Sequence, residues 1–279
     1  MNSIGDVPGL AGRRVVVLAG SRGIGRAVVE LFAAAEARVV AVARGEATLK
    51  ELAASDGQGR IVPLAADLSE PGAAEQVVSR AADLLGGIDV LVNNVGGWSD
   101  RPGATGPLLK ATHDAYTSVM DLNIRTTLFA TLEAARLMIA QGTGGSICCT
   151  ASIDGLFPAP GEGLYGAAKA AVVNLVGTLA YELGQHRIRV NAVAPAIIET
   201  DLTAEWLTGD DQRADRASLY PLRRFGQPDD VARTIVFLCS PAADWISGVT
   251  VPINGGQQAT GNAFRWVRQH NPVPPDRKL

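Results

Sequence analysis

The sequence predicts an α/β fold in which one doubly wound parallel sheet is covered by helices on both faces. Three observations lead to this prediction. Short apolar runs rich in β-branched residues alternate with segments of helical periodicity along the 279 residues. A glycine-rich turn follows the first of these runs, and neither an internal repeat nor a linker divides the chain. Alternating strands and helices are typical of parallel sheets whose crossover helices cover both faces.

Each element is expected from its own pattern. The run from Arg14 to Leu18 contains three valines and indicates a buried strand, and apolar residues from Ile24 to Ala35 then recur at helical spacing. Further strands are expected at 38–43, 61–65, 88–92, 145–150, 188–193 and 249–253. Further helices are expected at 46–54, 71–85, 112–139 (in one piece or two), 164–183 and 228–239. Residues 1–261 should form a single domain with a small lid at about 198–225, centred on 203–222, and a tail at 262–279.

Composition and charge argue against several function classes. The hydrophobic fraction of 47% supports a sizeable core, and a net charge of −3 gives no sign of a nucleic-acid surface. The three histidines are scattered, so we expect no metal site. The segment from Met1 to Leu10 lacks the pattern of a signal peptide, and no apolar run reaches the length of a membrane span. Cys148, Cys149 and Cys239 lack metal or redox spacing and fit a reducing cytoplasm. We therefore expect a cytoplasmic protein that binds neither nucleic acid nor membrane.

The turn after the first strand has the composition of a phosphate-binding loop. It reads Gly20-Ser21-Arg22-Gly23-Ile24-Gly25 and opens a long amphipathic helix. Glycines allow a sharp turn and a close approach to a pyrophosphate, and the helix N-terminus presents unpaired N–H groups to the anion. Glycine in such a turn can also be purely structural, but the position of this one favours dinucleotide binding.

The end of the second strand bears on which dinucleotide is bound. An acidic residue there usually contacts the ribose 2′-hydroxyl, whereas this chain reads Val42-Ala43-Arg44. Arg44 and Arg22 would pair with a 2′-phosphate, so we expect NADP(H), with NAD(H) as the less favoured cofactor. Two alternatives stay open: both arginines could be merely solvated, and Glu46 could contact the ribose.

Tyr165 and Lys169 lie four residues apart in a predicted helix, on one face and one turn from each other. A nearby ammonium favours the phenolate, so Tyr165 could exchange a proton closer to neutral pH than its ordinary pKa of about 10 allows. Such a pair also arises by chance, as an amphipathic tyrosine beside a solvated lysine. The residues around the pair decide between the two interpretations.

Several motifs, in order, resemble the short-chain dehydrogenase/reductase family, including its 3-oxoacyl-ACP reductase-like members. The resemblance extends from about Gly12 to Gly256. The glycine turn resembles the family's TGxxxGxG motif, although Leu18-Ala19 stands where Thr and the first Gly are usual. Asn93 to Gly96 resembles the NNAG motif, and Ser152 lies 13 positions before Tyr165, which is the usual spacing in the family.

The resemblance implies a Rossmann fold and a role for each matching residue. Ser152 would hydrogen-bond the substrate oxygen, and Tyr165 would act as general acid or base. Asn123 would hold a water beside Lys169 through a local distortion of its helix, and Lys169 would also bind the nicotinamide ribose. Further cofactor contacts would come from Asp67, Leu68, Asn94, Gly96, Tyr165, Pro195, Ile198 and Thr200.

The implied reaction is reversible hydride transfer between NADP(H) and a ketone or secondary alcohol, by a homotetramer or a dimer. A non-catalytic NADP-binding regulator on the same fold is an alternative. A sugar-nucleotide epimerase or dehydratase is another, although only 110 residues follow Lys169 and those relatives need a larger C-terminal domain. The substrate stays open among β-ketoacyl thioesters, polyketides, steroids, sugars and small alcohols. The lid, with Trp206 and Tyr220, and the loop from Gly97 to Leu109, with Trp98, are expected to line the substrate site.

Overall fold

The protein forms a seven-stranded sheet in the order β3-β2-β1-β4-β5-β6-β7, in a computed structural model that describes residues 9–204, 217 and 220–257. All neighbouring strands are parallel. The strands are β1 (Arg14–Leu18), β2 (Arg38–Ala43), β3 (Ile61–Ala65), β4 (Val90–Asn93), β5 (Gly145–Thr150), β6 (Ile188–Pro195) and β7 (Thr250–Ile253). The winding reverses between β1 and β4, which are neighbours in the sheet but not in the sequence, so the predicted doubly wound fold is confirmed.

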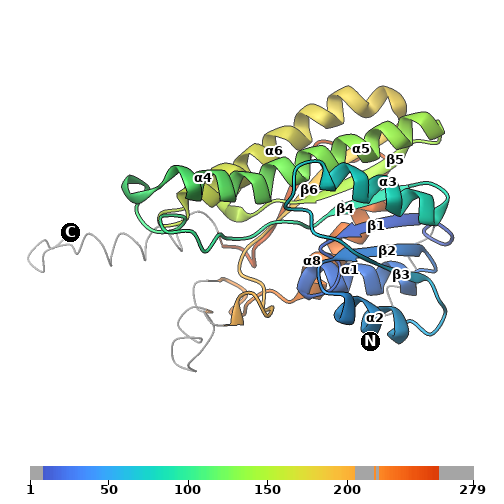
Figure 1. Cartoon of the computed structure of the whole chain (residues 1–279), viewed down its shortest axis with the longest axis horizontal. Coiled ribbons are helices and arrows are strands. Elements are labelled where there is room, and N and C mark those ends of the chain that lie inside the picture. Colours follow the sequence, from blue (N-terminus) through green and yellow to red (C-terminus); the bar gives the residue numbers. More distant parts are fainter. Residues whose placement is uncertain (1–8, 205–216, 218–219, 258–279) are drawn as a thin grey trace, which may run out of the picture.

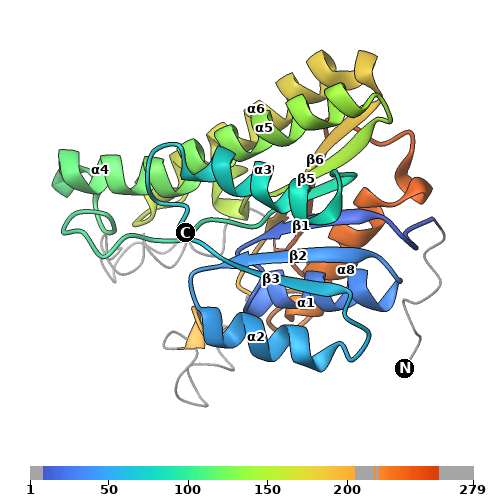
Figure 2. The same cartoon turned by 45° about the vertical axis from the view of Figure 1, so that its right-hand side comes forward.

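Helices cover both faces of this sheet, as Figures 1 and 2 show. The helices on one face are α3 (Ala73–Leu85), α5 (Thr126–Gln141) and α6 (Gly163–Leu183). The helices on the other are α1 (Gly23–Ala34), α2 (Glu46–Ser55) and α8 (Pro228–Cys239). The helix α4 (His113–Met120) runs into α5 through a π-helical turn, η3 (Asp121–Arg125). Short 3₁₀ turns are η2 (Leu108–Lys110), η4 (Ile153–Gly155), η5 (Gly184–His186) and η7 (Pro241–Ala243).

Strand β1 shows how one sheet supplies two cores. Val16 and Leu18 belong to the cluster on the side of α3, α5 and α6, whereas Val15 and Val17 belong to the cluster on the side of α1 and α8. All four side chains are fully buried. Successive side chains of a strand point to opposite faces, so a strand covered on both faces is apolar throughout. This is why the strands of this chain appear as continuous apolar runs in the sequence.

Several element boundaries differ from the sequence prediction, most of them by one or two residues. Helix α3 begins at Ala73 rather than 71, because Gly72 before it has a left-handed backbone with φ of +80°. Strand β4 occupies 90–93 rather than 88–92; Asp89, just before it, binds Arg14, with Nη2 and Oδ1 2.6 Å apart. The segment expected as helix at 112–139 is divided by the π-helical turn η3.

Among the described residues, one helix is long and apolar enough to cross a membrane by length and composition, contrary to the expectation that no run reaches that length. Within the 24 residues Gly163–His186, an 18-residue window has a mean hydropathy of 1.2, and 44% of that window is buried. Helix α6 packs on β6 and contributes Val172 and Val176 to the core. Packing against the sheet therefore accounts for much of its apolar composition, so this helix is weak evidence of a membrane span.

Candidate active site

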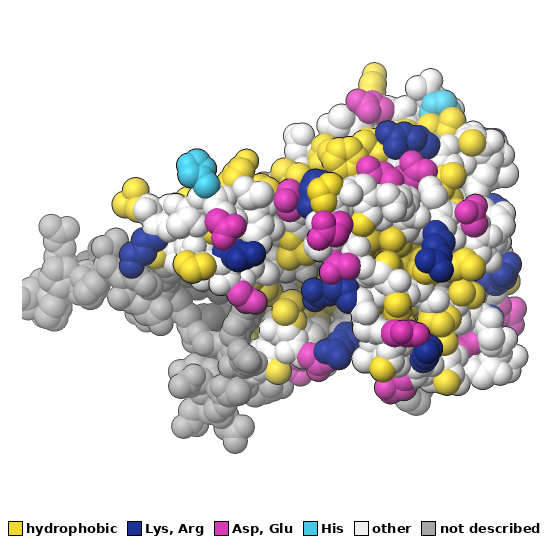
Figure 3. All heavy atoms as spheres, viewed as in Figure 1, with side chains coloured by type: hydrophobic (Ala, Val, Ile, Leu, Met, Phe, Trp, Pro, Cys, Tyr) yellow, Lys and Arg dark blue, Asp and Glu magenta, His cyan; other side chains and the backbone are white. Residues whose placement is uncertain are grey.

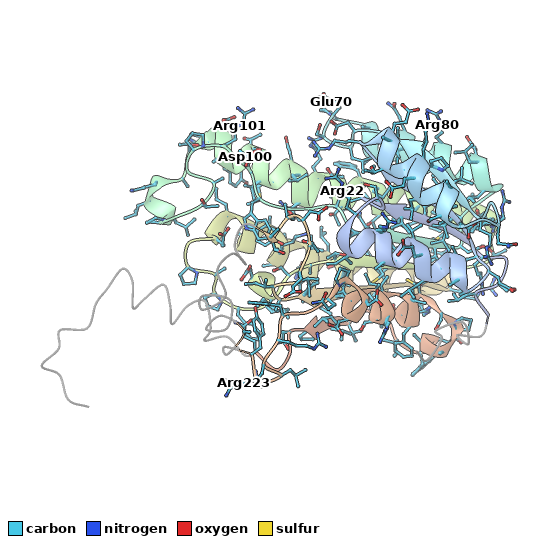
Figure 4. All side chains as sticks on the ribbon, turned by 90° about the horizontal axis from the view of Figure 1, so that it is seen from below. Arg22, Glu70, Arg80, Asp100, Arg101 and Arg223 are labelled. Atoms are coloured by element: carbon cyan, nitrogen blue, oxygen red, sulfur yellow. The ribbon has the colours of Figure 1, made fainter. Side chains whose placement is uncertain are left out.

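A cleft of about 1580 Å³ opens at the carboxyl ends of the parallel strands. In doubly wound sheets this edge, where the strand order reverses, is where ligands bind. Most of the site residues predicted from the sequence line it: Ser21, Arg22, Gly23, Ile24, Arg44, Asp67, Leu68, Asn94, Gly96, Ser152, Tyr165, Lys169, Pro195, Ile198 and Thr200. In Figure 4, Arg22 lies at the start of α1, while Asp100 and Arg101 belong to a separate loop. The fold therefore brings together motifs that are far apart in the sequence.

Three predicted residues lie behind the cleft wall instead of on it: Gly20, Gly25 and Asn123. A Cβ added to Gly20 would lie 3.1 Å from the carbonyl oxygen of Val17, and one added to Gly25 would lie 2.0 Å from that of Ala19. These two glycines therefore allow the start of α1 to pack closely against the turn that follows β1, and the exposed part of the turn is formed by the residues between them.

Ala19, which stands where the family motif has glycine, has a left-handed backbone. Its φ is +56°, in the left-handed region that favours glycine. An L-residue with a Cβ is disfavoured there by about 1–2 kcal/mol. Alanine at this position therefore carries backbone strain that glycine would not.

The cleft is basic where it meets β2. Arg22 and Arg44 are both exposed at the cleft. The backbone N–H of Ser69 donates to Asp67 over 3.0 Å, and this bond, with the charge of Arg44, holds the pKa of the Asp67 carboxyl below its usual range. Glu46 pairs with Lys50 on α2, with Oε1 and Nζ 2.7 Å apart, and does not line the cleft. The open alternative of a ribose contact from Glu46 therefore gains no support.

Lys169 is buried beneath the cleft, 2% exposed, and its Nζ donates a hydrogen bond to the carbonyl oxygen of Thr150 over 2.8 Å. Burial lowers the pKa of Lys169 to about 8. Gly96 makes room for this ammonium, because a Cβ at Gly96 would lie 2.4 Å from Nζ. Gly96 therefore lines the cleft and also leaves the space that the Lys169 ammonium occupies.

Asn123 anchors the loop that follows β4. Its Oδ1 accepts from the N–H of Gly97 over 3.1 Å, and its Nδ2 donates to the carbonyl oxygens of Gly97 and Val119 over 2.9 Å each. The side chain is fully buried within the π-helical turn. The local helix distortion that the family resemblance implies at Asn123 is therefore present.

Tyr165 lies between Ser152 and Trp98. The rings of Trp98 and Tyr165 stack with centroids 5.0 Å apart and an interplanar angle of 28°. Burial raises the pKa of Tyr165 well above its ordinary value, a hydrogen bond with Ser152 opposes this, and the charges of Asp154 and Glu162 add to it. The lower pKa expected from the Lys169 ammonium is therefore not found, since desolvation disfavours the phenolate more strongly.

Among the carboxyl groups that line the cleft and were not predicted as site residues, Asp154 and Glu162 both influence the pKa of Tyr165. Burial and the charge of Asp154 together raise the pKa of Glu162 to about 7, although contact with Trp98 opposes this rise. The one signal in the sequence is position, because Glu162 lies three residues before Tyr165 and therefore about one helical turn from it.

The predicted lid lies largely outside the described residues, as do Trp206 and the tail at 262–279. Tyr220, from the end of this segment, does line the cleft. It packs edge-on against Phe225, with ring centroids 5.7 Å apart. The prediction of a lid over the whole segment thus stays a prediction.

Comparisons with known proteins match this chain to reductases and dehydrogenases. The family model described as enoyl-(acyl carrier protein) reductase matches residues 18–258. The 3-oxoacyl-[acyl-carrier-protein] reductase FabG of Vibrio cholerae is 32% identical over 250 residues, which are 88% of this chain and 98% of that protein. L-rhamnose 1-dehydrogenase (NAD(P)(+)) of Azotobacter vinelandii is 34% identical over 259 residues, 88% of this chain and 97% of that one. Acetoin dehydrogenase YohF of Salmonella typhimurium has a similar solved structure, with a TM-score of 0.78 and 28% identity over 88% of this chain and 96% of that chain.

A doubly wound sheet with a glycine turn at its switch point defines a dinucleotide-binding protein. Within that class, this chain belongs to the short-chain dehydrogenase/reductase family, whose members are oxidoreductases of CH–OH and C=O groups that use NAD(H) or NADP(H). The residues present fit such a cofactor. Gly23 has a left-handed backbone and lies next to Thr200. A Cβ added to Gly23 would lie 3.0 Å from Cγ2 of Thr200 and would narrow the cleft that both residues line. Small residues thus keep the cleft open beside the helix N-terminus.

Proposed function

We propose that this protein is an NADP(H)-dependent oxidoreductase that interconverts a ketone and a secondary alcohol. The observation that supports this most directly is that Ser152, Tyr165 and Lys169 line one cleft together with the glycine turn. The alternative of a non-catalytic NADP-binding regulator has no comparable support, because it would require neither a buried lysine nor a tyrosine beside a serine hydroxyl.

The side chains of the cleft divide the chemistry among them. When bound, the nicotinamide supplies or accepts the hydride. Ser152 and Tyr165 would donate hydrogen bonds to the substrate oxygen, where negative charge develops during reduction. Tyr165 would release its proton to that oxygen as general acid, and in the oxidising direction it would take the proton back as general base. The raised pKa of Tyr165 keeps the phenol protonated before reaction, as a general acid requires.

Lys169 and Asn123 would support Tyr165. The Lys169 ammonium lies 5.7 Å from the centroid of the Tyr165 ring, so its charge would favour the phenolate that forms as the proton leaves. Its other role would be to hold the ribose hydroxyls of the cofactor. Asn123, in the π-helical turn, would hold a water beside Lys169 and so link the site to solvent.

The preference for NADP(H) rests on Arg22 and Arg44. Both are exposed at the end of the cleft where β2 terminates, and no acidic residue takes the strand-end position after Ala43. Arginine pairs with a phosphate through two parallel hydrogen bonds. The remaining cofactor contacts would be those that the family resemblance implies, from Asp67 at the adenine to Thr200 at the carboxamide.

The proposal also includes self-association, a cytoplasmic location and closure over the substrate. Side chains of α5 and α6 leave an apolar surface, which in Figure 3 is visible as yellow atoms over these helices, and Tyr181 on α6 is 91% exposed. Association into a dimer or a homotetramer would cover it. All three cysteines are free, which fits a cytoplasmic location. The segment around Tyr220 would close over a small-molecule substrate.

Replacing Tyr165 by Phe tests the proposal. Loss of the phenol should lower turnover by about 10²–10⁴-fold, the size of a general acid–base contribution, and should leave NADPH binding nearly intact. Turnover is measured as NADPH oxidation with a panel of ketones, quinones and β-ketoacyl thioesters, repeated with NADH, and binding is measured by calorimetry.

Tyr181→Phe is the matched control, because it removes a hydroxyl from the exposed face of the same helix, outside the cleft. It should retain wild-type turnover. Full activity in Tyr165→Phe would contradict the assigned role. NADPH binding by the wild-type protein without turnover of any carbonyl compound would instead favour the regulator.

A further inference from the structure

Close to Ser152 and Tyr165, the cleft carries the carboxyl groups of Asp154 and Glu162, which hydride transfer does not require. Asp154 lies in the turn η4 just after Ser152, and Glu162 immediately precedes α6. Both line the cleft, together with Trp98. The backbone N–H of Asp154 donates to the Ser152 hydroxyl over 3.1 Å, and the Asp154 carboxyl lies 3.4 Å from the same hydroxyl. One carboxyl is thus adjacent to the serine that would contact the substrate oxygen.

The Glu162 carboxyl is incompletely satisfied. Its Oε2 is buried and no donor among the described residues meets it at hydrogen-bonding geometry, although Trp98 lies close enough to favour the ionised form. No Lys, Arg or His in the described part of the chain forms an ion pair with Asp154 or Glu162; Arg101, which also lines the cleft, pairs with Asp114 over 3.5 Å. A buried acceptor without a donor costs free energy that a bound donor recovers.

Trp98 adds a second, independent component to this end of the cleft. Its ring stacks on Tyr165 and is only partly buried, so it forms a wall beside the reacting phenol. An aromatic ring attracts a cation placed within about 6 Å of its centroid. A carboxyl group without a cationic partner and an aromatic wall together are suited to one kind of ligand group, a protonated amine.

We propose that Trp98 and Glu162 form a subsite for a protonated amino group, so that the preferred substrate is a small amino ketone or the corresponding amino alcohol. This inference rests on the proposed function. With the substrate oxygen on Tyr165 and Ser152, the ammonium would donate to Glu162 and lie beside the Trp98 ring. Asp154 would add to the negative potential that attracts it. An anionic substrate would be disfavoured by the same two carboxyls.

A pair of ketones of matched shape tests this subsite. 1-Methylpiperidin-4-one is largely protonated near neutral pH, whereas 4-methylcyclohexanone carries no charge. We expect the wild-type protein to reduce the amino ketone with a kcat/KM at least about tenfold higher, the size of one charge-assisted contact. Glu162→Gln should abolish most of this ratio, and Glu162→Asp, which keeps the charge, should retain part of it.

Asp114→Asn is the control, because it removes one negative charge from the same side of the molecule outside the cleft. It should leave the ratio unchanged. Binding is measured independently, by calorimetry of 1-methylpiperidin-4-ol and 4-methylcyclohexanol on the Tyr165→Phe protein with NADP⁺, where the same preference and the same loss in Glu162→Gln are expected.

The outcomes distinguish the amine subsite from the proposed oxidoreductase reaction. Equal kcat/KM and equal binding for the charged and neutral compounds, unchanged in Glu162→Gln, would overturn the subsite and leave the proposed reaction standing. Failure of the wild-type protein to turn over any carbonyl compound would overturn the proposed function, while a binding preference for the amino alcohol that disappears in Glu162→Gln would still support the subsite.

Discussion

Ala19 is a single residue with a strained backbone, in the turn that follows β1. Its left-handed φ of +56° is unfavourable for alanine, and it stands where the family motif has glycine. Ala19→Gly should therefore raise the free energy of unfolding by about 0.5–1 kcal/mol, because relief of the backbone strain exceeds the entropy that glycine adds to the unfolded chain. Urea denaturation measures this change.

Ala34→Gly is the matched control for that prediction. Ala34 is exposed and ends α1, where φ is negative, so glycine there should lower the free energy of unfolding by up to about 1 kcal/mol. Opposite signs for the two substitutions would support strain at Ala19. Destabilisation by both would contradict it.

Residues also show where prediction from the sequence ends. Tyr165, Lys169 and Ser152 could be placed in one site because helical periodicity and motif spacing are local properties of the chain. The raised pKa of Tyr165 could not be predicted in this way, because it results mainly from burial in the folded protein. Glu162 was missed for the same reason, because only the folded cleft shows that no described cationic side chain pairs with it.

At the scale of elements, the π-helical turn η3 between α4 and α5 holds the loop after β4 through hydrogen bonds from Asn123. Asn123 is fully buried there and satisfies both backbone groups of Gly97. Asn123→Ala would leave two backbone groups unpaired, each costing about 1–3 kcal/mol, so we expect a loss of about 2–4 kcal/mol in the free energy of unfolding and a large loss of activity. Denaturation and NADPH oxidation measure the two effects.

Asn174→Ala is the matched control, because it also removes an asparagine side chain from a helix. Asn174 lies on the exposed face of α6, so no buried backbone group depends on it. This variant should be nearly neutral in both measurements. Wild-type stability in Asn123→Ala would show that Gly97 finds other partners and that the loop does not depend on the π-helical turn.

Element order was predictable because strands buried on both faces are continuous apolar runs, as β1 and β2 are. The boundaries of the elements were less predictable than their order. The start of α3 depends on the left-handed backbone of Gly72, and the division of the segment from 112 to 139 depends on hydrogen bonds from Asn123 to a loop 26 residues earlier. Interactions between distant segments leave no periodic signal in the sequence.

At the scale of the whole molecule, the composition of α6 suits two contacts at once. Its inner face packs on the sheet and positions Tyr165 and Lys169, and its outer face remains apolar in part, with Tyr181 fully accessible at the surface. Phe129 and Ile139 of α5 are also exposed, each by 38%. Exposed apolar area on neighbouring helices is typical of a surface that associates with another copy of the chain.

Tyr181→Glu should therefore weaken self-association. A charge on this surface has to be desolvated when two copies meet, so we expect the mass measured by light scattering to shift from a dimer or tetramer toward a smaller species. Leu84→Glu, on α3, introduces the same charge at a position 44% exposed and should leave the mass unchanged. A monomeric wild-type protein, or an unchanged mass in Tyr181→Glu, would contradict this role of α6. Because Tyr165 and Lys169 lie on the same helix, a smaller species with reduced turnover would further indicate that association helps to hold the active-site helix in position.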